Sequence, residues 1–343
     1  MNQNKKLVII NNEKISKKEN NFYCDNVDMK STPEGLSNNF DVLVIARKSK
    51  IERSQKINLQ KIKISSNILV FLFHILKTLK DTKTNYLLIS ITPYTFFSYL
   101  ILLAFGRKVF VYLRSDGYQE YKYILGFWGP AIYHIMFSII SWKANLISCR
   151  KHILKGKSGK IVYPSQLNQK WFLSRTEANL DRVKLLYIGR VKVEKGIFSL
   201  LKILEKFKED FTLSILGSLE KNRKKLEQKN INVIHFNNED HDSIINIYDQ
   251  HNIFVLPSFT EGHPQVLDES LARLRPVIVF NEISHVIDKR KGVFVCKRDS
   301  NSLSTLIKYI IKNYSLIQKD MMTNNLPVKK IFLDRISKII EAN

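Results

Sequence analysis

The clearest pattern in the chain is the stretch Phe254-Val-Leu-Pro-Ser-Phe-Thr-Glu261-Gly-His-Pro-Gln-Val-Leu-Asp-Glu269. The apolar run Ile253–Leu256 predicts a buried strand of a parallel sheet. Pro264 is placed to begin a helix, because its missing N–H is not needed in a first turn. Glu261 then falls in a loop at the carboxyl edge of the sheet, where open α/β sheets bind ligands, and Glu269 falls inside the helix. A carboxylate at this edge can accept two hydrogen bonds, which suits a ligand with neighbouring hydroxyl groups.

A second block lies upstream: Leu185-Leu-Tyr-Ile-Gly189-Arg190-Val-Lys-Val-Glu194-Lys195-Gly196. Its apolar residues predict another buried strand, and Lys195 stands at the start of an expected helix. A diphosphate between strand and helix would meet Arg190, Lys195 and the free N–H groups of the helix, all of which favour negative charge. Gly189 and Gly196 would keep side chains out of the way of the phosphates.

Together the two blocks resemble the E-x7-E signature and the strand–G-R–x–EKG–helix pattern of the group 1 glycosyltransferases, also called glycosyltransferase family 4. The resemblance covers residues 181–325 well and residues 40–165 loosely. It implies the GT-B fold, an α/β architecture of two doubly wound parallel-sheet (Rossmann-like) domains facing across a cleft. It also implies a retaining transfer of a sugar from a nucleoside-diphosphate sugar to an acceptor hydroxyl, with no metal and no other cofactor.

The resemblance assigns catalytic roles to Arg190, Lys195, Glu261 and Asp116. Arg190 and Lys195 would hold the diphosphate of the donor and stabilise it as it leaves. Glu261 would lie near the donor sugar, and Glu269 would bind the ribose. The expected donor-binding residues are Gly189, Arg190, Lys195, Gly262, His263, Pro264, Gln265, Val266 and Glu269.

Three segments of the chain depart from the family pattern. His263 and Gln265 replace its commoner E-G-F-G/P loop, and His263 is either an extra polar contact or a partly exposed loop histidine. Asp116 stands where the family often has histidine facing the donor sugar, and the alternative for it is a helix-capping aspartate. Residues 11–14 replace a glycine-rich loop, so the sequence does not locate an acceptor loop.

Strands and helices alternate along the chain, which predicts parallel sheets. We expect an acceptor-side Rossmann-like domain over residues 1–170, a nucleotide-sugar-binding Rossmann-like domain over residues 171–327, and a C-terminal helix over residues 328–343. In proteins of this resemblance that helix often packs back on the first domain. Residues 11–39 show little pattern and are predicted to be loop. In the second half, helices are expected at 195–207, 219–228, 242–249, 264–274 and 301–313.

The chain has a formal net charge of +24, and residues 1–180 hold 28 Lys/Arg against 11 Asp/Glu. This excess implies an anionic partner or, alternatively, lysines on ordinary solvated faces. The stretch Phe127–Trp142 has aromatic residues at both ends and Lys122 and Lys143 outside them. It suits a helix in a bilayer interface, or else a core helix of the first domain.

We therefore predict a cytoplasmic enzyme, peripheral on the inner face of the plasma membrane and in contact with an anionic membrane surface. The expected acceptor is a lipid-linked glycan or a precursor of surface polysaccharide or lipopolysaccharide. A nucleic acid is not an expected partner, because it would leave the paired glutamates without a role. The alternatives are a sugar-nucleotide epimerase of the same fold and a non-catalytic nucleotide-sugar-binding protein.

Overall fold

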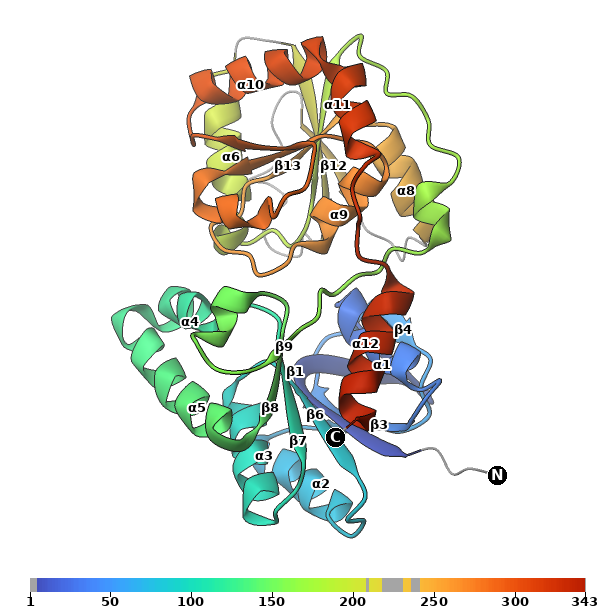
Figure 1. Ribbon diagram of the computed structural model, residues 1–343, viewed down its shortest axis with the longest axis vertical. Helices are drawn as coiled ribbons and strands as arrows, with labels where there is room; N and C mark the ends of the chain where they lie inside the picture. Colours follow the sequence, from blue (N-terminus) through green and yellow to red (C-terminus); the bar gives the residue numbers. More distant parts are fainter. Residues whose placement is uncertain (1–4, 208–209, 218–230, 236–240, 343) are drawn as a thin grey trace. The chain divides into compact units, whose positions relative to one another are not determined.

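The computed structural model describes residues 5–207, 210–217, 231–235 and 241–342. The chain forms two compact units, one of Met1–Gln166 with Lys329–Asn343 and one of Leu167–Val328 (Figure 1). We call these unit 1 and unit 2. The helix expected at residues 219–228 lies outside the described residues.

Unit 1 is built on a sheet that has nine strands within the described residues. Strand β1 pairs in parallel with β3 and β6, and β7, β8 and β9 continue the parallel order. Strand β2 pairs antiparallel with β1 and β4. The strands are β1 (Lys6–Lys18), β2 (Asn21–Cys24), β3 (Asp41–Lys48), β4 (Gln55–Ile57), β5 (Ile62–Ser65), β6 (Asn85–Ile89), β7 (Val109–Leu113), β8 (Asn145–Ser148) and β9 (Lys160–Ile161).

Alternating side chains of β1 point to opposite faces of this sheet, as strand geometry requires. Val8 and Ile10 join a core with α2, α3 and α5, whereas Leu7 and Ile9 join a core with α1 and α12. Helix α12 thus packs within unit 1, where the Asn39 side-chain amide donates to the Ser337 hydroxyl at 3.1 Å. The helices are α1 (Val27–Leu36), α2 (Ile68–Thr78), α3 (Pro93–Ala104), α4 (Gly117–Leu125), α5 (Gly129–Lys143) and α12 (Lys329–Glu341), with the 3₁₀ turns η1 (Gly126–Trp128) and η2 (Lys151–Leu154).

The prediction of a loop over residues 11–39 is wrong. Strand β1 continues to Lys18, β2 pairs with it, and α1 follows. Ile15 is 1% exposed and belongs to the core beneath α1 and α12, so a single apolar residue anchors the extension. Lys14, Lys17 and Lys18 around it are exposed, and the other buried positions, Asn11 and Ser16, are polar, so the sequence shows no apolar pattern.

Residues Gly117–Lys143 form the one helical stretch among the described residues that is long and apolar enough to cross a membrane by length and composition. Only 28% of the most apolar part of this stretch is buried. The stretch is divided at η1, and its two helices pack against each other. The ring centroid of Tyr133 in α5 lies 4.9 Å from that of Tyr118 and 5.2 Å from that of Tyr121, both in α4.

Unit 2 has an entirely parallel sheet in the order β12-β11-β10-β13-β14-β15. The chain adds strands on one side of β10 and then, from β13, on the other. This is the doubly wound order, whose switch point between β10 and β13 is where such folds bind ligands. The strands are β10 (Val183–Ile188), β11 (Phe211–Gly217), β12 (Ile231–His235), β13 (Ile253–Leu256), β14 (Val277–Phe280) and β15 (Val293–Cys296).

Helices flank this sheet on both faces (Figure 1). They are α6 (Ile197–Leu204), α8 (His241–Asp249), α9 (Gln265–Ala272), α10 (Ser300–Lys312) and α11 (Tyr314–Met321), with the 3₁₀ turns η3 (Gln169–Phe172), η4 (Val193–Lys195) and η5 (Asn281–Val286). Their inner residues form one apolar core with the strands.

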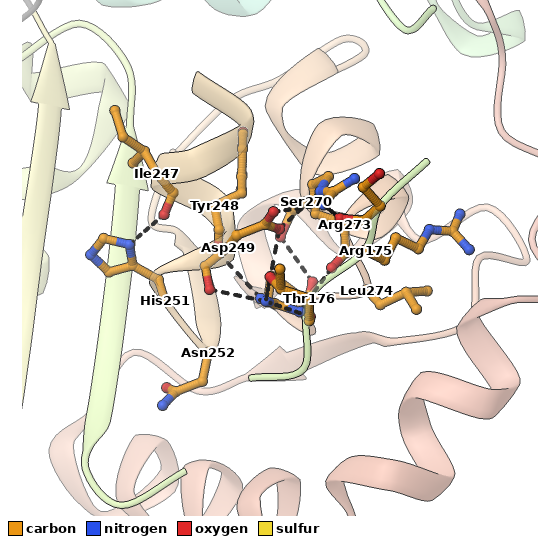
Figure 2. A network of polar contacts seen from close by, with 12 residues as sticks. Arg175, Thr176, Ile247, Tyr248, Asp249, His251, Asn252, Ser270, Arg273 and Leu274 are labelled. Atoms are coloured by element: carbon orange, nitrogen blue, oxygen red, sulfur yellow. Dashed lines mark hydrogen bonds and ion pairs between the residues drawn. The ribbon is translucent and has the colours of Figure 1, made fainter. Parts of the chain in front are cut away.

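Two buried arginines, Arg273 and Arg275, tie α8, α9 and the first residues of unit 2 together. Figure 2 shows Arg273 beside Asp249 and Thr176. Arg273, just after α9, donates to both carboxylate oxygens of Asp249 at 2.8 and 2.6 Å. It also donates to the carbonyl oxygens of Trp171, Leu173 and Ser174. Arg275 donates to the carbonyl oxygen of Thr176 at 3.0 Å. These bonds fix the helix that carries Glu269 against the helix that carries Tyr248.

Candidate functional site

The loops that follow β10 and β13 meet at the switch point of unit 2. Gly196 follows η4 with φ of +69°, a conformation that favours glycine. A Cβ on it would lie 1.8 Å from the carbonyl oxygen of Pro257, directly after β13. The N–H of Phe259 donates to the carbonyl oxygen of Glu194 at 3.0 Å. The two sequence blocks are therefore in backbone contact.

Lys195 and Glu261 form an ion pair in this contact. The Lys195 Nζ lies 2.7 Å from Glu261 Oε1, and the Ser258 hydroxyl donates to the same oxygen at 2.6 Å. Their side chains are 21% and 11% exposed, so solvent screens the pair less than a surface pair. Lys195, which we expected to hold the diphosphate, and Glu261, which we expected near the donor sugar, thus lie side by side.

Arg190 lies in the same loop as Lys195 and is exposed. Its carbonyl oxygen accepts a hydrogen bond from the buried Tyr187 hydroxyl at 2.9 Å, which holds the backbone of the loop. Gly189 at the end of β10 has φ of +159°. The guanidinium of Arg190 is therefore carried by an anchored loop at the carboxyl edge of the sheet.

Glu269 is oriented by a residue that sequence reasoning missed. The Tyr248 hydroxyl donates to Glu269 Oε2 at 3.0 Å and lies 3.1 Å from the carbonyl oxygen of Val266. Tyr248 is fully buried, and burial, followed by the charge of Glu269, raises its pKa far above the usual range. The phenol is therefore a fixed donor. Its place in α8 shows no local signal, because the contact joins residues far apart in the sequence.

The imidazole of His263 points into the protein. Its Nε2 lies 2.7 Å from Asp268 Oδ2, and the two side chains are 0% and 2% exposed. Arg290 Nε lies 2.8 Å from the other oxygen of Asp268. The alternative of a partly exposed loop histidine is wrong. His263 and Asp268 instead fix the loop between Glu261 and α9, and a role for His263 in donor binding stays a prediction.

The remaining loop residues lead into α9. Gly262 and Pro264 are buried, and Pro264 is the N-cap residue, so the helix begins at Gln265 as the proline predicted. The Val266 carbonyl oxygen lies 3.1 Å from the Tyr248 hydroxyl. His285 Nε2 lies 2.8 Å from the carbonyl oxygen of Glu261, which holds the loop from the side of η5.

Asp116 belongs to unit 1, where it caps α4. Its carboxylate accepts from the N–H of Tyr118 at 3.0 Å and pairs with Lys155 Nζ at 2.8 Å. The capping alternative is therefore correct, and a catalytic role of Asp116 stays a prediction. A shallow hollow lies beside it at the carboxyl edges of β6 and β7, lined in part by Ser90, Ser115 and Glu120.

Metal-binding side chains do not cluster in the part of the chain that the structure describes. Within it, no group of three or more His, Cys, Asp or Glu residues could hold a metal ion. The cysteines Cys24, Cys149 and Cys296 are buried and free.

Comparison with known proteins found relatives of the part of the chain that contains this site. Residues 170–326 match the family model of glycosyl transferases group 1. An uncharacterized glycosyltransferase of Haemophilus influenzae is 29% identical over 144 residues, covering 38% of this chain and 39% of that protein. The capsular polysaccharide biosynthesis glycosyltransferase CapM of Staphylococcus aureus is 30% identical over 148 residues, covering 40% and 38%. The chain thus spans about two fifths of the length of the curated relatives it matches.

Two solved structures resemble nearly the whole chain. Sucrose-phosphate synthase from Thermosynechococcus elongatus has a TM-score of 0.71 at 14% identity, covering 97% of this chain and 98% of that one. HepE of Anabaena, solved in complex with UDP-glucose, has a TM-score of 0.71 at 9% identity, covering 98% and 100%. At such identities the likeness shows the fold.

The chain is thus an α/β protein with two mainly parallel sheets and a GT-B-like fold, which confirms the predicted fold class. Residues 170–326, a little under half of the chain, match the group 1 glycosyltransferases, glycosyltransferase family 4. The family resemblance stated from the two sequence blocks is confirmed.

Proposed function

We propose that this protein is a retaining glycosyltransferase that moves a sugar from a nucleoside-diphosphate sugar to an acceptor hydroxyl group. The observation that carries the proposal is the pair of Lys195 and Glu261, 2.7 Å apart at the switch point of unit 2. An activated sugar needs a cation at its diphosphate and a hydrogen-bond acceptor at its hydroxyls. This pair supplies both within one contact.

In the proposed reaction the bond between the anomeric carbon and the diphosphate oxygen breaks. A bond from the acceptor oxygen to the same carbon forms on the same face. Lys195 and Arg190 stabilise the negative charge that develops on the leaving diphosphate. The acceptor proton passes to an oxygen of the leaving phosphate, so no protein base is required.

The remaining residues of the site hold the donor. Glu269, oriented by Tyr248, accepts from the ribose hydroxyls, and the backbone of Gly262–Val266 contacts the sugar. Gly189 and Gly196 let the phosphate-binding loop pack closely, since a Cβ on them would meet the Tyr187 hydroxyl and the Pro257 carbonyl oxygen. We expect no metal and no further cofactor to be needed. Because HepE is solved with UDP-glucose, UDP-sugars are the first donors to test.

For the acceptor we propose a lipid-linked glycan, as in the assembly of a surface polysaccharide or lipopolysaccharide. The matched relative CapM acts in capsular polysaccharide biosynthesis, and residues 1–180 carry a large excess of positive charge. The protein would then work at the inner face of the plasma membrane, bound peripherally to its anionic surface. Unit 1, with the hollow beside Asp116, would be the acceptor side.

The test is donor binding followed by product analysis. UDP and UDP-sugars should raise the melting temperature, since a ligand that binds only the native state stabilises it. Lys195→Ala should reduce transfer about 100- to 1000-fold, as for loss of one charge-stabilising group. Lys192→Ala is the matched control, because Lys192 lies in the same loop and pairs weakly with Glu194 at 3.7 Å.

The products separate the alternatives. Transfer to an added glycan acceptor with the anomeric configuration kept would support the proposal. Conversion of the donor to an epimer without an acceptor would identify an epimerase instead. Nucleotide binding with neither product, over a panel of donors and acceptors, would leave a non-catalytic binding protein.

A further inference from the structure

Helix α5 has two apolar stripes, whereas a helix at a protein surface ordinarily has one. On its inner side, Tyr133 and Ile140 are buried in the core beneath the sheet. On its outer side a second stripe runs with spacings of four and three residues and continues back into η1. Its members are 36–72% exposed: Trp128, Ile132, Ile135, Ile139 and Trp142.

Helix α2 repeats this arrangement. Leu69, Phe73 and Leu76 follow the same spacing and are 75%, 53% and 43% exposed. Helix α3 contacts both α2 and α5 and adds Phe97, 44% exposed, with Phe105 just beyond its end at 57%. The buried residues of all three helices share one core, and Figure 1 shows the helices on the same side of the sheet. We call their joint outer surface the helical face.

Basic residues border the helical face along one edge. Each helix leads from one parallel strand to the next, so all three run in the same direction and their carboxyl ends lie together. Residues 61–160 contain 15 Lys/Arg and 3 Asp/Glu. Among these acids, Asp81 pairs with Lys6 and Asp116 pairs with Lys155. The basic residues at the helix ends are Lys77, Lys80, Arg107, Lys108 and Lys143.

Two of these lysines lie against aromatic rings of the face. Lys77 Nζ is 4.3 Å from the ring centroid of Phe73, and Lys143 Nζ is 4.8 Å from that of Trp142. A lysine that covers an aromatic ring with its stem keeps its ammonium at the polar boundary. Aromatic residues beside cations are typical of protein segments at the level of lipid headgroups.

We propose that the helical face docks on an anionic lipid bilayer, with its aromatic and aliphatic side chains entering the headgroup region and its basic edge meeting lipid phosphates. A bilayer fits this surface because the apolar area extends across three helices and its charged border is of one sign. The inference deepens the proposed function, on which it rests for the membrane-borne acceptor. Docking itself requires neither donor nor transfer.

The tryptophans provide a direct test. The chain has three: Trp128 and Trp142, 70% and 72% exposed on the helical face, and Trp171, 1% exposed in unit 2. On vesicles of phosphatidylcholine and phosphatidylglycerol at low salt, brominated lipids should quench the fluorescence of Trp128 and Trp142. The variant Trp128→Phe/Trp142→Phe retains only Trp171 and should show no quenching. Equal quenching of this variant and the wild type would overturn the proposal.

Flotation with the same vesicles tests the surface by substitution. Ile132→Ser with Ile135→Ser should weaken binding about tenfold or more, through lost apolar burial. Lys143→Gln should weaken it about fivefold at low salt and little at high salt. Leu316→Ser with Met322→Ser is the matched control, because these unit 2 residues are 62% and 61% exposed and should leave binding unchanged.

The outcomes separate docking from catalysis. Vesicle binding that ignores the isoleucine substitutions, or that occurs equally on phosphatidylcholine alone, would refute the docking surface. A dimer that dissociates in the isoleucine variant, with no vesicle binding, would show that the face joins two copies of the chain. UDP binding, measured by thermal shift, reports on the donor site independently of the vesicles. If only the proposed function is wrong, UDP binding would be absent while vesicle binding remains.

Discussion

Asp249→Ala tests whether two buried guanidinium groups hold unit 2 together. The Asp249 carboxylate contacts Arg273 at 2.6 Å and lies 3.8 Å from Arg275, and both arginine side chains are 1% exposed. Burial already lowers the pKa of Arg275, which reflects the cost of keeping its charge away from water. Removing the carboxylate would leave two buried positive charges without this counter-ion.

The cost follows from what remains after the substitution. Breaking a buried ion pair by removing one partner costs about 3–5 kcal/mol. Arg273 would keep its carbonyl partners Trp171, Leu173 and Ser174, so we take the lower end, about 3 kcal/mol. For a domain of this size 1 kcal/mol shifts the melting temperature by about 2–4 °C, so unit 2 should melt roughly 6–12 °C lower.

In the Trp128→Phe/Trp142→Phe background, Trp171 fluorescence follows this melting, since Trp171 is buried in unit 2 and its carbonyl oxygen is one of the acceptors of Arg273. The control is Asp210→Ala, because Asp210 is 72% exposed and pairs with Arg182 at 2.6 Å on the surface. Such a pair contributes about 0–1 kcal/mol. If both variants melted at the same temperature, the argument that the buried pair holds α8 and α9 together would be refuted.

Two further predictions concern α8 and its end. Tyr248→Phe should weaken UDP binding about tenfold, since a hydrogen bond to a charged group contributes about 1.5–3 kcal/mol. The same substitution should leave the binding of inorganic pyrophosphate unchanged. Calorimetry that finds equal losses for both ligands would contradict a role of Tyr248 at the ribose. Burial lowers the pKa of His251 in the folded protein from the usual value of 6.5. Between the folded and unfolded pKa values the unfolded chain therefore binds more protons, so the free energy of unfolding decreases as the pH falls. The melting temperature of wild type relative to His251→Gln should therefore decrease from about pH 8 to about pH 5, and a constant difference would contradict it.

The strands and the location of the site could be predicted because their signals are local. A strand buried on both faces is a continuous apolar run, and the run Ile253–Leu256 has the bounds of β13. The carboxyl ends of parallel strands share one edge, so two blocks that each follow such a strand were expected to meet there. The contact between the loop of Lys195 and the loop of Glu261 follows from that rule.

The residues that hold the site in place could not be predicted in the same way. Tyr248 orients Glu269 from another helix, and Arg290 reaches Asp268 from beyond β14. Such pairs have no fixed spacing in the sequence, so a single sequence does not reveal them. For α5 the sequence left both an interface helix and a core helix open, because a periodicity shows that a face is apolar but not what covers it.

The geometry at Lys195 links the two ends of the bond that the proposed reaction breaks. A lysine ammonium has three donors, and Glu261 Oε1 takes one of them at 2.7 Å. Two donors remain, so in the proposed reaction Lys195 would hold the Glu261 carboxylate and the oxygens of the diphosphate at the same time. The Ser258 hydroxyl, in the same loop as Glu261 and 2.6 Å from the same Glu261 oxygen, fixes the carboxylate. Because the ammonium carries its charge at one point, a shift of the Glu261 loop would move the cation relative to the leaving phosphate, and sugar binding and leaving-group stabilisation would be coupled through a single atom.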